Sequence, residues 1–307
     1  EIIDNVNIIR EKIIFEISNR PWISNLKKNI EKISPDIIMV HGTSSFSAFR
    51  SAIIAKRLNL PLIMDNHMIF SIVRNDILGK LYYFLVRTLV SSFVYKNVKI
   101  IFGVTKETCD YLIKCEGHKK EKVKLLNLGV DSTQFYPEKN ITRNKDVFKI
   151  IQTGKLNKDK RPDLLALAVI KLLKKNKKFY LTYYGDGDPK IINYIKQLFK
   201  ENDLLDHINF EPFVSYKNLR KVFNNADLCV FPFGTSLSAV ECAFCGTNVI
   251  MTDDDASIER EKDGVGICYK TGNIDDLVEK IETLSNKIHV YKKNLILNLN
   301  KIKQKYD

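Results

Sequence analysis

The chain has 307 residues, 45% of them hydrophobic, and a formal net charge of +13. This length predicts two domains, and the hydrophobic share supplies two ordinary cores, which excludes a largely disordered chain. Six scattered cysteines do not resemble a disulfide framework in a chain this long. The most apolar region, 81–95, is interrupted by Arg87, whereas a membrane span needs about 20 apolar residues in a row.

The positive charge is concentrated in the first half. Residues 1–150 hold 24 Lys and Arg against 15 Asp and Glu, and the rest of the chain holds 25 against 21. A basic half favours an anionic partner such as nucleic acid, acidic lipid or phosphate. A lysine-rich composition that keeps the protein soluble explains the same numbers. The chain has no nucleic-acid recognition motif or aromatic platform, so we expect no nucleic-acid partner.

The first 35 residues are expected to be helical, because isoleucines recur there at mixed helical spacing. The chain opens with Glu1 rather than Met inside this segment, so we expect a processed, truncated or fragmentary product. No signal-peptide pattern is visible, so export is not indicated. After Pro35, short apolar runs alternate with helical segments, which is typical of a parallel, doubly wound sheet. The predicted strands of this half are 37–40, 61–64, 99–102 and 123–127.

A polar stretch, 128–147, interrupts the alternation. We assign 1–137 to a first domain, 138–147 to a linker, 148–285 to a second domain and 286–307 to a helical tail that could pack back on the first half. Both domains are predicted to be α/β, with Rossmann-like parallel sheets. The predicted strands of the second half are 149–152, 179–184, 208–210, 228–231, 248–251 and 265–268.

Two loops of the second half suit an anion. Gly154 to Arg161 runs from a strand end into a helix start, and its lysines supply charge. Phe233 to Ser236 follows another strand, and its hydroxyls can cap the next helix. Each loop taken alone is equally well explained as an ordinary solvated turn.

Glu241 lies among small apolar residues of a short predicted helix. A carboxylate in such surroundings is rarely buried without partners. Two alternative partners fit this carboxylate: a ribose diol, which offers two hydroxyl donors, or a nearby lysine in a structural salt bridge. Cys242 and Cys245 are interpreted as small core residues rather than metal ligands.

His41 and His67 end two successive predicted strands. A single histidine at such a position is usually a satisfied core residue. Two at neighbouring strand ends favour a functional role, because ligands of parallel sheets bind at this edge.

Eight segments in this order resemble the retaining glycosyltransferases of family 4, which have the two-domain GT-B fold. They are PDIIMVHG (35–42), LPLIMDNH (60–67), IIFGVTKETCDYL (100–112), LGVDSTQFYP (128–137), TGKLNKDKRPDLL (153–165), YYGDGDP (183–189), INFEPFVSYKNLRKVFNNADLCVFP (208–232) and ECAFCGTNVIMTDD (241–254).

The resemblance implies two Rossmann-like domains facing a cleft, with a UDP- or GDP-linked sugar on the second domain and a glycan or lipid-linked acceptor on the first. It implies transfer with retention, in cell-surface polysaccharide synthesis, with no metal and no cofactor. The implied catalytic residues are His67, Lys155 and Lys160. The implied donor-binding residues are Gly154, Gly185, Gly187, Phe213, Phe233, Gly234, Thr235, Ser236, Leu237 and Glu241, and those on the acceptor side are His41 and Gly42.

The chain departs from the family pattern, and two of the departures, Phe233 and the missing start of the first domain, leave an alternative open. Phe233 stands eight residues before Glu241, where the family has a glutamate, and Lys155 replaces an arginine. The first strand and glycine-rich loop of the first domain are absent, so that domain is expected to be incomplete. The alternative function is a non-catalytic sugar-nucleotide-binding subunit of a glycan assembly system.

The segment 78–96 combines aromatic residues with Lys80, Arg87 and Lys96. It suits a helix at an anionic membrane surface and equally a helix packed on the sheet. We therefore expect a cytoplasmic protein, with peripheral contact at the inner face of the membrane as one interpretation of the basic first half.

Overall fold

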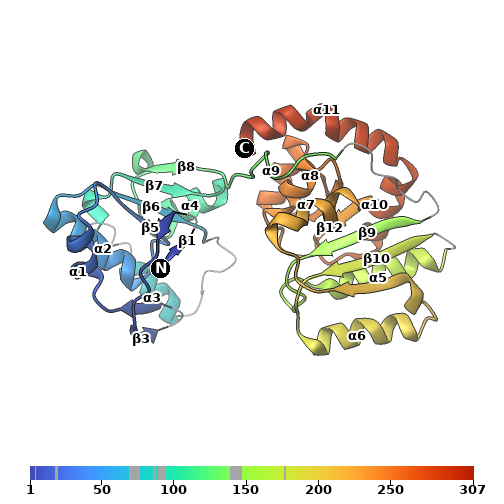
Figure 1. Cartoon of the computed structure of the whole chain (residues 1–307), viewed down its shortest axis with the longest axis horizontal. Helices are drawn as coiled ribbons and strands as arrows, with labels where there is room; N and C mark the ends of the chain where they lie inside the picture. The colour runs from blue at the N-terminus through green and yellow to red at the C-terminus, as the bar shows by residue number, and fades with distance from the viewer. Residues whose placement is uncertain are drawn as a thin grey trace. The chain divides into compact units, whose positions relative to one another are not determined.

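The computed structural model describes residues 1–3, 5–17, 20–68, 77–85, 88, 95–138, 147–175 and 178–307. The chain forms two compact units, unit 1 (1–127) and unit 2 (128–307) (Figure 1). The division falls at the start of the polar stretch 128–147, and residues 128–137, which the sequence analysis assigned to the first domain, belong to unit 2. Most of the predicted linker, 139–146, lies outside the described residues.

Unit 1 contains a four-stranded parallel sheet of order β5-β6-β7-β8. Buried apolar side chains, including Met64 and Ile101, form its core with helices α2 and α4. The elements of this part are β5 (Ile38–His41), α2 (Phe46–Leu58), β6 (Leu62–Asn66), α3 (Ile77–Leu85), η3 (Tyr95–Asn97), β7 (Ile100–Gly103), α4 (Lys106–Lys114), η4 (Lys120–Lys122) and β8 (Val123–Leu125).

The beginning of the chain is not the predicted helix but two short antiparallel strand pairs followed by one helix. The isoleucines there are β-branched, and extended backbone suits them better than a helix. Phe15 and Trp22 stack across the second pair, with ring centroids 5.5 Å apart. The elements are β1 (Ile2–Ile3), β2 (Val6–Asn7), β3 (Ile13–Ile17), β4 (Arg20–Ile23) and α1 (Leu26–Ile33).

Unit 2 contains a six-stranded, all-parallel sheet of order β11-β10-β9-β12-β13-β14. The chain builds outward from β9 in one direction, then returns to its other side with β12. Open parallel sheets bind ligands at such a reversal, outside the carboxyl ends of the strands. The strands are β9 (Phe148–Thr153), β10 (Phe179–Tyr184), β11 (Ile208–Glu211), β12 (Leu228–Val230), β13 (Asn248–Thr252) and β14 (Ile267–Tyr269).

Helices cover both faces of this sheet (Figure 1). Successive residues of β12 point to opposite faces, so Leu228 and Val230 join one core cluster and Cys229 joins the other. Cys242 and Cys245 are buried in the second cluster, as core residues. The helices are α5 (Pro162–Leu173), α6 (Pro189–Lys200), η5 (Leu205–His207), α7 (Tyr216–Asn224), α8 (Ser238–Phe244), α9 (Asp255–Asp263), α10 (Ile274–Asn286) and α11 (Ile288–Tyr306).

The tail is helical, as predicted, but α11 packs within unit 2 rather than on the first half. Leu295, Leu299 and Ile302 are buried against the core beside α8 and β13. The segment 128–137 joins the same unit, because the Val130 amide donates to the Tyr306 carbonyl at 2.6 Å. Apolar positions repeated along one face of α11 account for this packing.

Candidate functional site

Two glycine-containing loops of unit 2 lie backbone against backbone after β9 and β10. Gly154 donates its amide to the Tyr184 carbonyl at 2.9 Å, and Leu156 donates to the Asp186 carbonyl at 3.0 Å. Gly185 has φ +143°, and a Cβ there would lie 2.2 Å from the Gly154 carbonyl oxygen. A Cβ at Gly187 would likewise lie 2.4 Å from Leu156. The closely packed loops therefore require glycine at both positions.

Lys160 joins the loop after β9 to the loop after β12, at the point where the strand order reverses. Its ammonium donates to the Gly234 carbonyl at 2.6 Å. Burial lowers the pKa of Lys160, against the opposing effect of Asp159 and Asp254. Lys155 is exposed at the same strand end. A diphosphate bound here would offset the cost of burying the Lys160 charge.

Side chains of α9 hold the loop after β12 in place. The sequence analysis did not predict this helix. Ser257 donates to the Thr235 hydroxyl at 2.7 Å, and Arg260 donates to the Ser236 carbonyl at 3.1 Å. The predicted capping of α8 by loop hydroxyls is wrong. Its N-cap is Leu237, which makes no side-chain cap bond, and the Thr235 hydroxyl bonds Ser257 instead.

Glu241 is 6% exposed on α8. Burial raises the pKa of its carboxyl, and a hydrogen bond with Ser238 opposes that shift. The alternative of a salt bridge to lysine is not seen in the described part of the chain. A buried carboxyl without a cation is well suited to accept hydrogen bonds from neutral hydroxyl donors.

Aromatic rings are exposed near the same edge of unit 2. Phe213 follows β11 and is 72% exposed, and Phe233 follows β12 and is 41% exposed. Tyr216, at the start of α7, lies near enough to Glu241 for that carboxylate to raise its pKa, although burial is the larger cause. Exposed rings of this kind can contact the base or sugar of a nucleotide.

In unit 1, Asp65 brings the two strand-end histidines together. One of its carboxylate oxygens lies 2.7 Å from His41 Nδ1 and 3.7 Å from His67 Nε2, and the other accepts from the Gly42 amide at 3.3 Å. Asp65 is mostly buried, whereas both histidines are more than half exposed. Gly42 has φ +83°, which favours glycine at this turn. Asp65 can therefore orient both imidazoles at one sheet edge.

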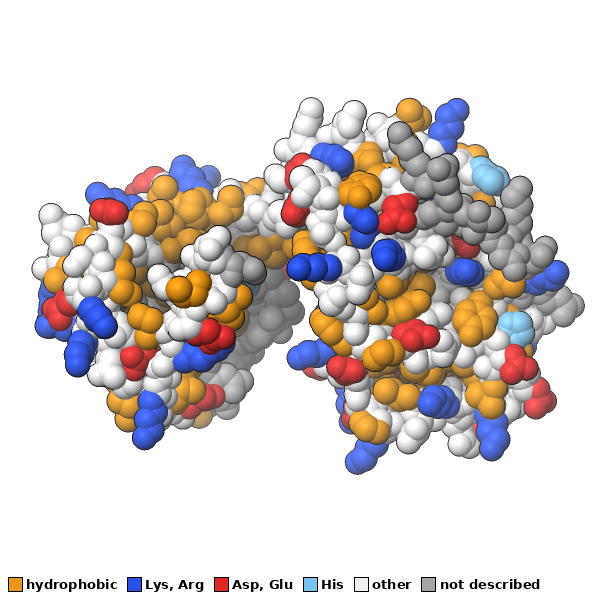
Figure 2. All heavy atoms as spheres, in the orientation of Figure 1, with side chains coloured by type: hydrophobic (Ala, Val, Ile, Leu, Met, Phe, Trp, Pro, Cys, Tyr) orange, Lys and Arg blue, Asp and Glu red, His pale blue; other side chains and the backbone are white. Residues whose placement is uncertain are grey.

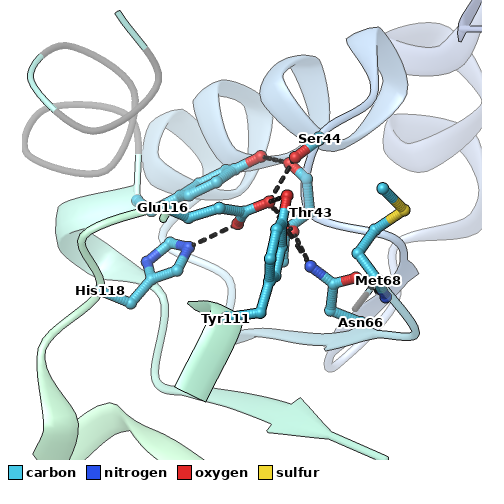
Figure 3. A network of polar contacts seen from close by, with 8 residues as sticks. Thr43, Ser44, Asn66, Met68, Tyr111, Glu116 and His118 are labelled. Carbon is cyan, nitrogen blue, oxygen red and sulfur yellow. Dashed lines mark hydrogen bonds and ion pairs between the residues drawn. The ribbon is translucent and has the colours of Figure 1, made fainter. Parts of the chain in front are cut away.

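Beneath these loops lies a polar network around Glu116, which is fully buried (Figure 3). One carboxylate oxygen accepts from Thr43 at 2.9 Å and from Ser44, and Asn66 and Tyr111 reach it at 3.5 and 3.4 Å. The other oxygen pairs with the buried His118 at 3.0 Å. Further bonds of the network run from Asn66 to Thr43 (2.6 Å), from the Met68 amide to Asn66 (2.7 Å) and from Tyr95 to the Thr43 carbonyl.

This network ties the loop after β5 to the chain after β6, and these are the loops that carry Gly42 and His67. The sequence analysis missed Glu116, because its partners lie up to 73 residues away along the chain. It also gave no role to Asp65, which lies in β6 two residues before His67.

The structure thus places the predicted residues in two groups, one in each unit. One edge of the unit 2 sheet carries the predicted Gly154, Lys155, Lys160, Gly185, Gly187 and the loop 233–237. One edge of the unit 1 sheet carries His41, Gly42 and His67. In the described parts of the chain, no three His, Cys, Asp or Glu side chains are placed to hold a metal ion.

Two family models match the chain. Residues 134–297 match the glycosyl transferases group 1 model, which covers more than half of the chain. The chain belongs to the group 1 glycosyltransferases. Residues 9–134 match the Glycosyltransferase Family 4 model. Both matches confirm the resemblance seen in the sequence, and with it the GT-B class of two parallel-sheet domains.

The following proteins are similar to this glycosyltransferase at low sequence identity. Mannosylfructose-phosphate synthase of Agrobacterium fabrum is 24% identical over 177 residues, which are 52% of this chain and only 38% of that protein. Anabaena HepE in complex with UDP superposes with a TM-score of 0.74 at 15% identity, covering 92% of this chain and 78% of that one. A glycosyltransferase from Rickettsia africae superposes with a TM-score of 0.69 at 20% sequence identity, and the match covers 91% of this chain and 77% of that one. At these identities the structures show the shared fold. HepE is also known in complex with UDP-glucose.

Proposed function

We propose that this chain transfers a sugar, with retention, from a UDP- or GDP-linked donor to a glycan or lipid-linked acceptor of a cell-surface polysaccharide. The observation that carries the proposal is the Lys160–Gly234 contact, which joins two loops where the strand order of unit 2 reverses. HepE, which has a similar structure, is known in complex with UDP and with UDP-glucose, and this favours a UDP-linked donor over a GDP-linked one.

In the proposed reaction, Lys155, Lys160 and the backbone of Ser236 and Leu237 bind the diphosphate, and Glu241 accepts hydrogen bonds from the ribose. The bond from the anomeric carbon to the diphosphate oxygen breaks, and a bond to the acceptor oxygen forms on the same face. The acceptor proton passes to the departing diphosphate. The ammonium groups, of which that of Lys160 is held by the Gly234 carbonyl, stabilise the charge that develops there. On the acceptor side, Asp65 lies 3.7 Å from the imidazole of His67, the histidine that the family resemblance implies as catalytic. The proposed reaction uses no metal.

Calorimetry with UDP and GDP tests this proposal directly. Lys160→Ala is expected to weaken UDP binding about 10- to 100-fold, because a hydrogen bond to a charged group contributes about 1.5–3 kcal/mol. Glu241→Ala is expected to have an effect of similar size. Lys158→Ala removes an exposed charge from the same loop and serves as the control, with less than about a twofold effect. If neither nucleotide binds, or Lys158→Ala matches Lys160→Ala, the proposed donor site is wrong.

Binding of uridine is expected to strengthen as pH rises through the acidic range. Burial raises the pKa of Glu241 above its usual 4.5, so the empty site holds the proton at pH values where a free glutamate has lost it. Ribose hydroxyls donate to the ionised form, and binding is therefore favoured above the raised pKa. Uridine has no phosphate that titrates in this range. The affinity of Glu241→Gln should stay flat with pH, and a wild-type profile equally flat would contradict the ribose role.

Phe233 supports one competing function, a non-catalytic sugar-nucleotide-binding subunit. It stands where the family has a glutamate and is partly exposed at the site. Donor turnover separates the two functions, with UDP-glucose hydrolysis followed as release of UDP. Slow hydrolysis by the wild-type chain supports the enzyme, whereas nucleotide binding without any turnover, in the presence of glycan acceptors as well, supports the subunit.

Membrane contact through α3 is part of the proposal. None of the helices in the described residues is long and apolar enough to cross a membrane. Ile77, Leu78, Leu81 and Phe84 are each more than half exposed on α3, with Lys80 beside them, while 86–87 and 89–94 lie outside the described residues. Apolar side chains are visible at the surface in Figure 2. An apolar helix face flanked by lysine suits an acidic bilayer surface.

Flotation with anionic vesicles measures this contact. Replacing Leu81 and Phe84 with glutamine is expected to reduce the bound fraction several-fold, because about 1.5–3 kcal/mol is lost for each large apolar side chain left out of the bilayer. Equal flotation of this variant and the wild type would contradict contact through α3.

A further inference from the structure

A cavity of about 590 Å³ opens at the amino ends of the unit 1 strands, away from the edge that carries His41 and His67. Pro61, which precedes β6, lines it together with Lys99, which precedes β7, and Lys122, which precedes β8. Because the strands are parallel, these positions share one edge of the sheet. Pockets for small ligands commonly measure about 300–1,000 Å³.

Four of the nine lining residues are lysines and none is acidic; we call this cavity the lysine pocket (Lys56, Lys96, Lys99 and Lys122). No ion pair is recorded for any of these four lysines in the described part of the chain. Glu121 opposes the lowering of the Lys122 pKa, but its effect is weaker than those of burial and of Lys119. The pocket therefore concentrates positive charge without matching negative charge.

Lys122 is held in place rather than free in solvent. It is partly buried, and its ammonium donates to the Lys96 carbonyl at 2.6 Å. Burial, followed by the charge of Lys119, lowers the pKa of Lys122, and Lys99 adds to this effect. An anion in the pocket would stabilise the charged form and offset the repulsion between the lysines.

Helix electrostatics explain only one of the four lysines. Lys56 lies in the last turn of α2, where the helix dipole favours a cation. Lys96 and Lys122 lie in the last turns of the three-residue helices η3 and η4, whose dipoles are small, and Lys99 lies at a strand start. The convergence of these three lysines on one cavity therefore requires another reason.

We propose that the lysine pocket binds a compact polyanion, a phosphate monoester or diphosphate group. Ammonium groups bind phosphate as point charges, and several of them around one cavity favour a group with two or more negative charges over a single carboxylate. The pocket belongs to unit 1 and contains none of the loops of the candidate donor site. The group can come from a soluble phosphorylated metabolite or from the headgroup of a lipid.

Calorimetry with inorganic pyrophosphate tests the proposal in a chain that already carries Lys155→Ala and Lys160→Ala. This background removes the lysines of the donor loop, so the result is independent of the proposed function. Adding Lys56→Gln, Lys99→Gln and Lys122→Gln is expected to weaken the remaining binding about tenfold or more. The control adds Lys28→Gln and Lys32→Gln, two exposed lysines of α1 in the same unit. Unfolding midpoints of all variants verify that unit 1 stays folded.

The two sources are distinguished by a second arm, cosedimentation with phosphatidylcholine vesicles with and without phosphatidic acid. Loss of vesicle binding in the pocket variant alone assigns the site to a lipid headgroup. Pyrophosphate binding that depends on the pocket, without vesicle binding, assigns it to a soluble ligand. The proposal is overturned if the background chain binds neither probe, or if the pocket and control variants lose binding equally.

Discussion

Glu116→Ala is expected to destabilise unit 1 by about 3–5 kcal/mol, because it leaves the buried His118 without its partner. It also removes the acceptor shared by Thr43, Ser44, Asn66 and Tyr111. Urea unfolding followed by tryptophan fluorescence measures this effect in unit 1 alone. The chain has a single tryptophan, Trp22, and it lies in that unit.

Asp110→Ala is the matched control. Asp110 pairs with Lys114 one turn along α4 at 2.9 Å, and both side chains are exposed, so its loss should cost only about 0.3–0.5 kcal/mol. Glu116→Gln keeps the shape and one acceptor oxygen, and we expect a loss between the two. Equal effects of Glu116→Ala and Asp110→Ala would show that the buried network contributes little to unit 1.

Gly185→Ala is expected to destabilise unit 2 and to weaken UDP binding. The added Cβ would lie 2.2 Å from the Gly154 carbonyl, which is too close for any side chain, so the two loops must separate. Overpacking, combined with the strain of an alanine at a φ of +143°, should lower the free energy of unfolding of unit 2 by about 2–4 kcal/mol. Displacement of the loop that carries Lys155 and Lys160 should reduce UDP affinity by about tenfold or more. Far-UV circular dichroism and calorimetry measure the two effects.

Gly272→Ala separates the steric clash from the backbone strain. Gly272 also has positive φ, +79°, but a Cβ there meets nothing within 4 Å. We expect this substitution to lower the free energy of unfolding of unit 2 by about 1 kcal/mol and to leave UDP affinity unchanged. If Gly185→Ala behaves in the same way, the close approach of the two loops is not what forms the site.

Much of the fold could be predicted because its signals are local. Helix α2 begins and ends at the predicted residues, 46 and 58, and β10 covers the predicted 179–184. Short apolar runs bounded by polar loops mark strands buried on both faces. The same reasoning was wrong for residues 1–23, where isoleucine spacing predicted a helix and the chain forms strand pairs, and right only for α1. Spacing cannot distinguish these when β-branched residues dominate.

The candidate site was only partly accessible to sequence reasoning. The residues named from the loops and strand ends do lie at sheet edges, and their roles stay predictions. Asp65, Glu116 and Arg260 were not recognised, because each acts through partners that are distant along the chain or carried by an unpredicted helix.

The sequence by itself determined the class of the protein, since alternating apolar strands and helices and eight ordered motifs depend on residues close together along the chain. Only the tertiary structure decided which loops meet. The strand order places β12 beside β9, and this brings the Gly234 carbonyl to the Lys160 ammonium, 74 residues away. Contacts of this kind follow from how strands pair across a sheet, which no local pattern encodes. The same holds for Glu116, whose buried carboxyl group has its hydrogen-bond partners only because three segments of unit 1 converge on it.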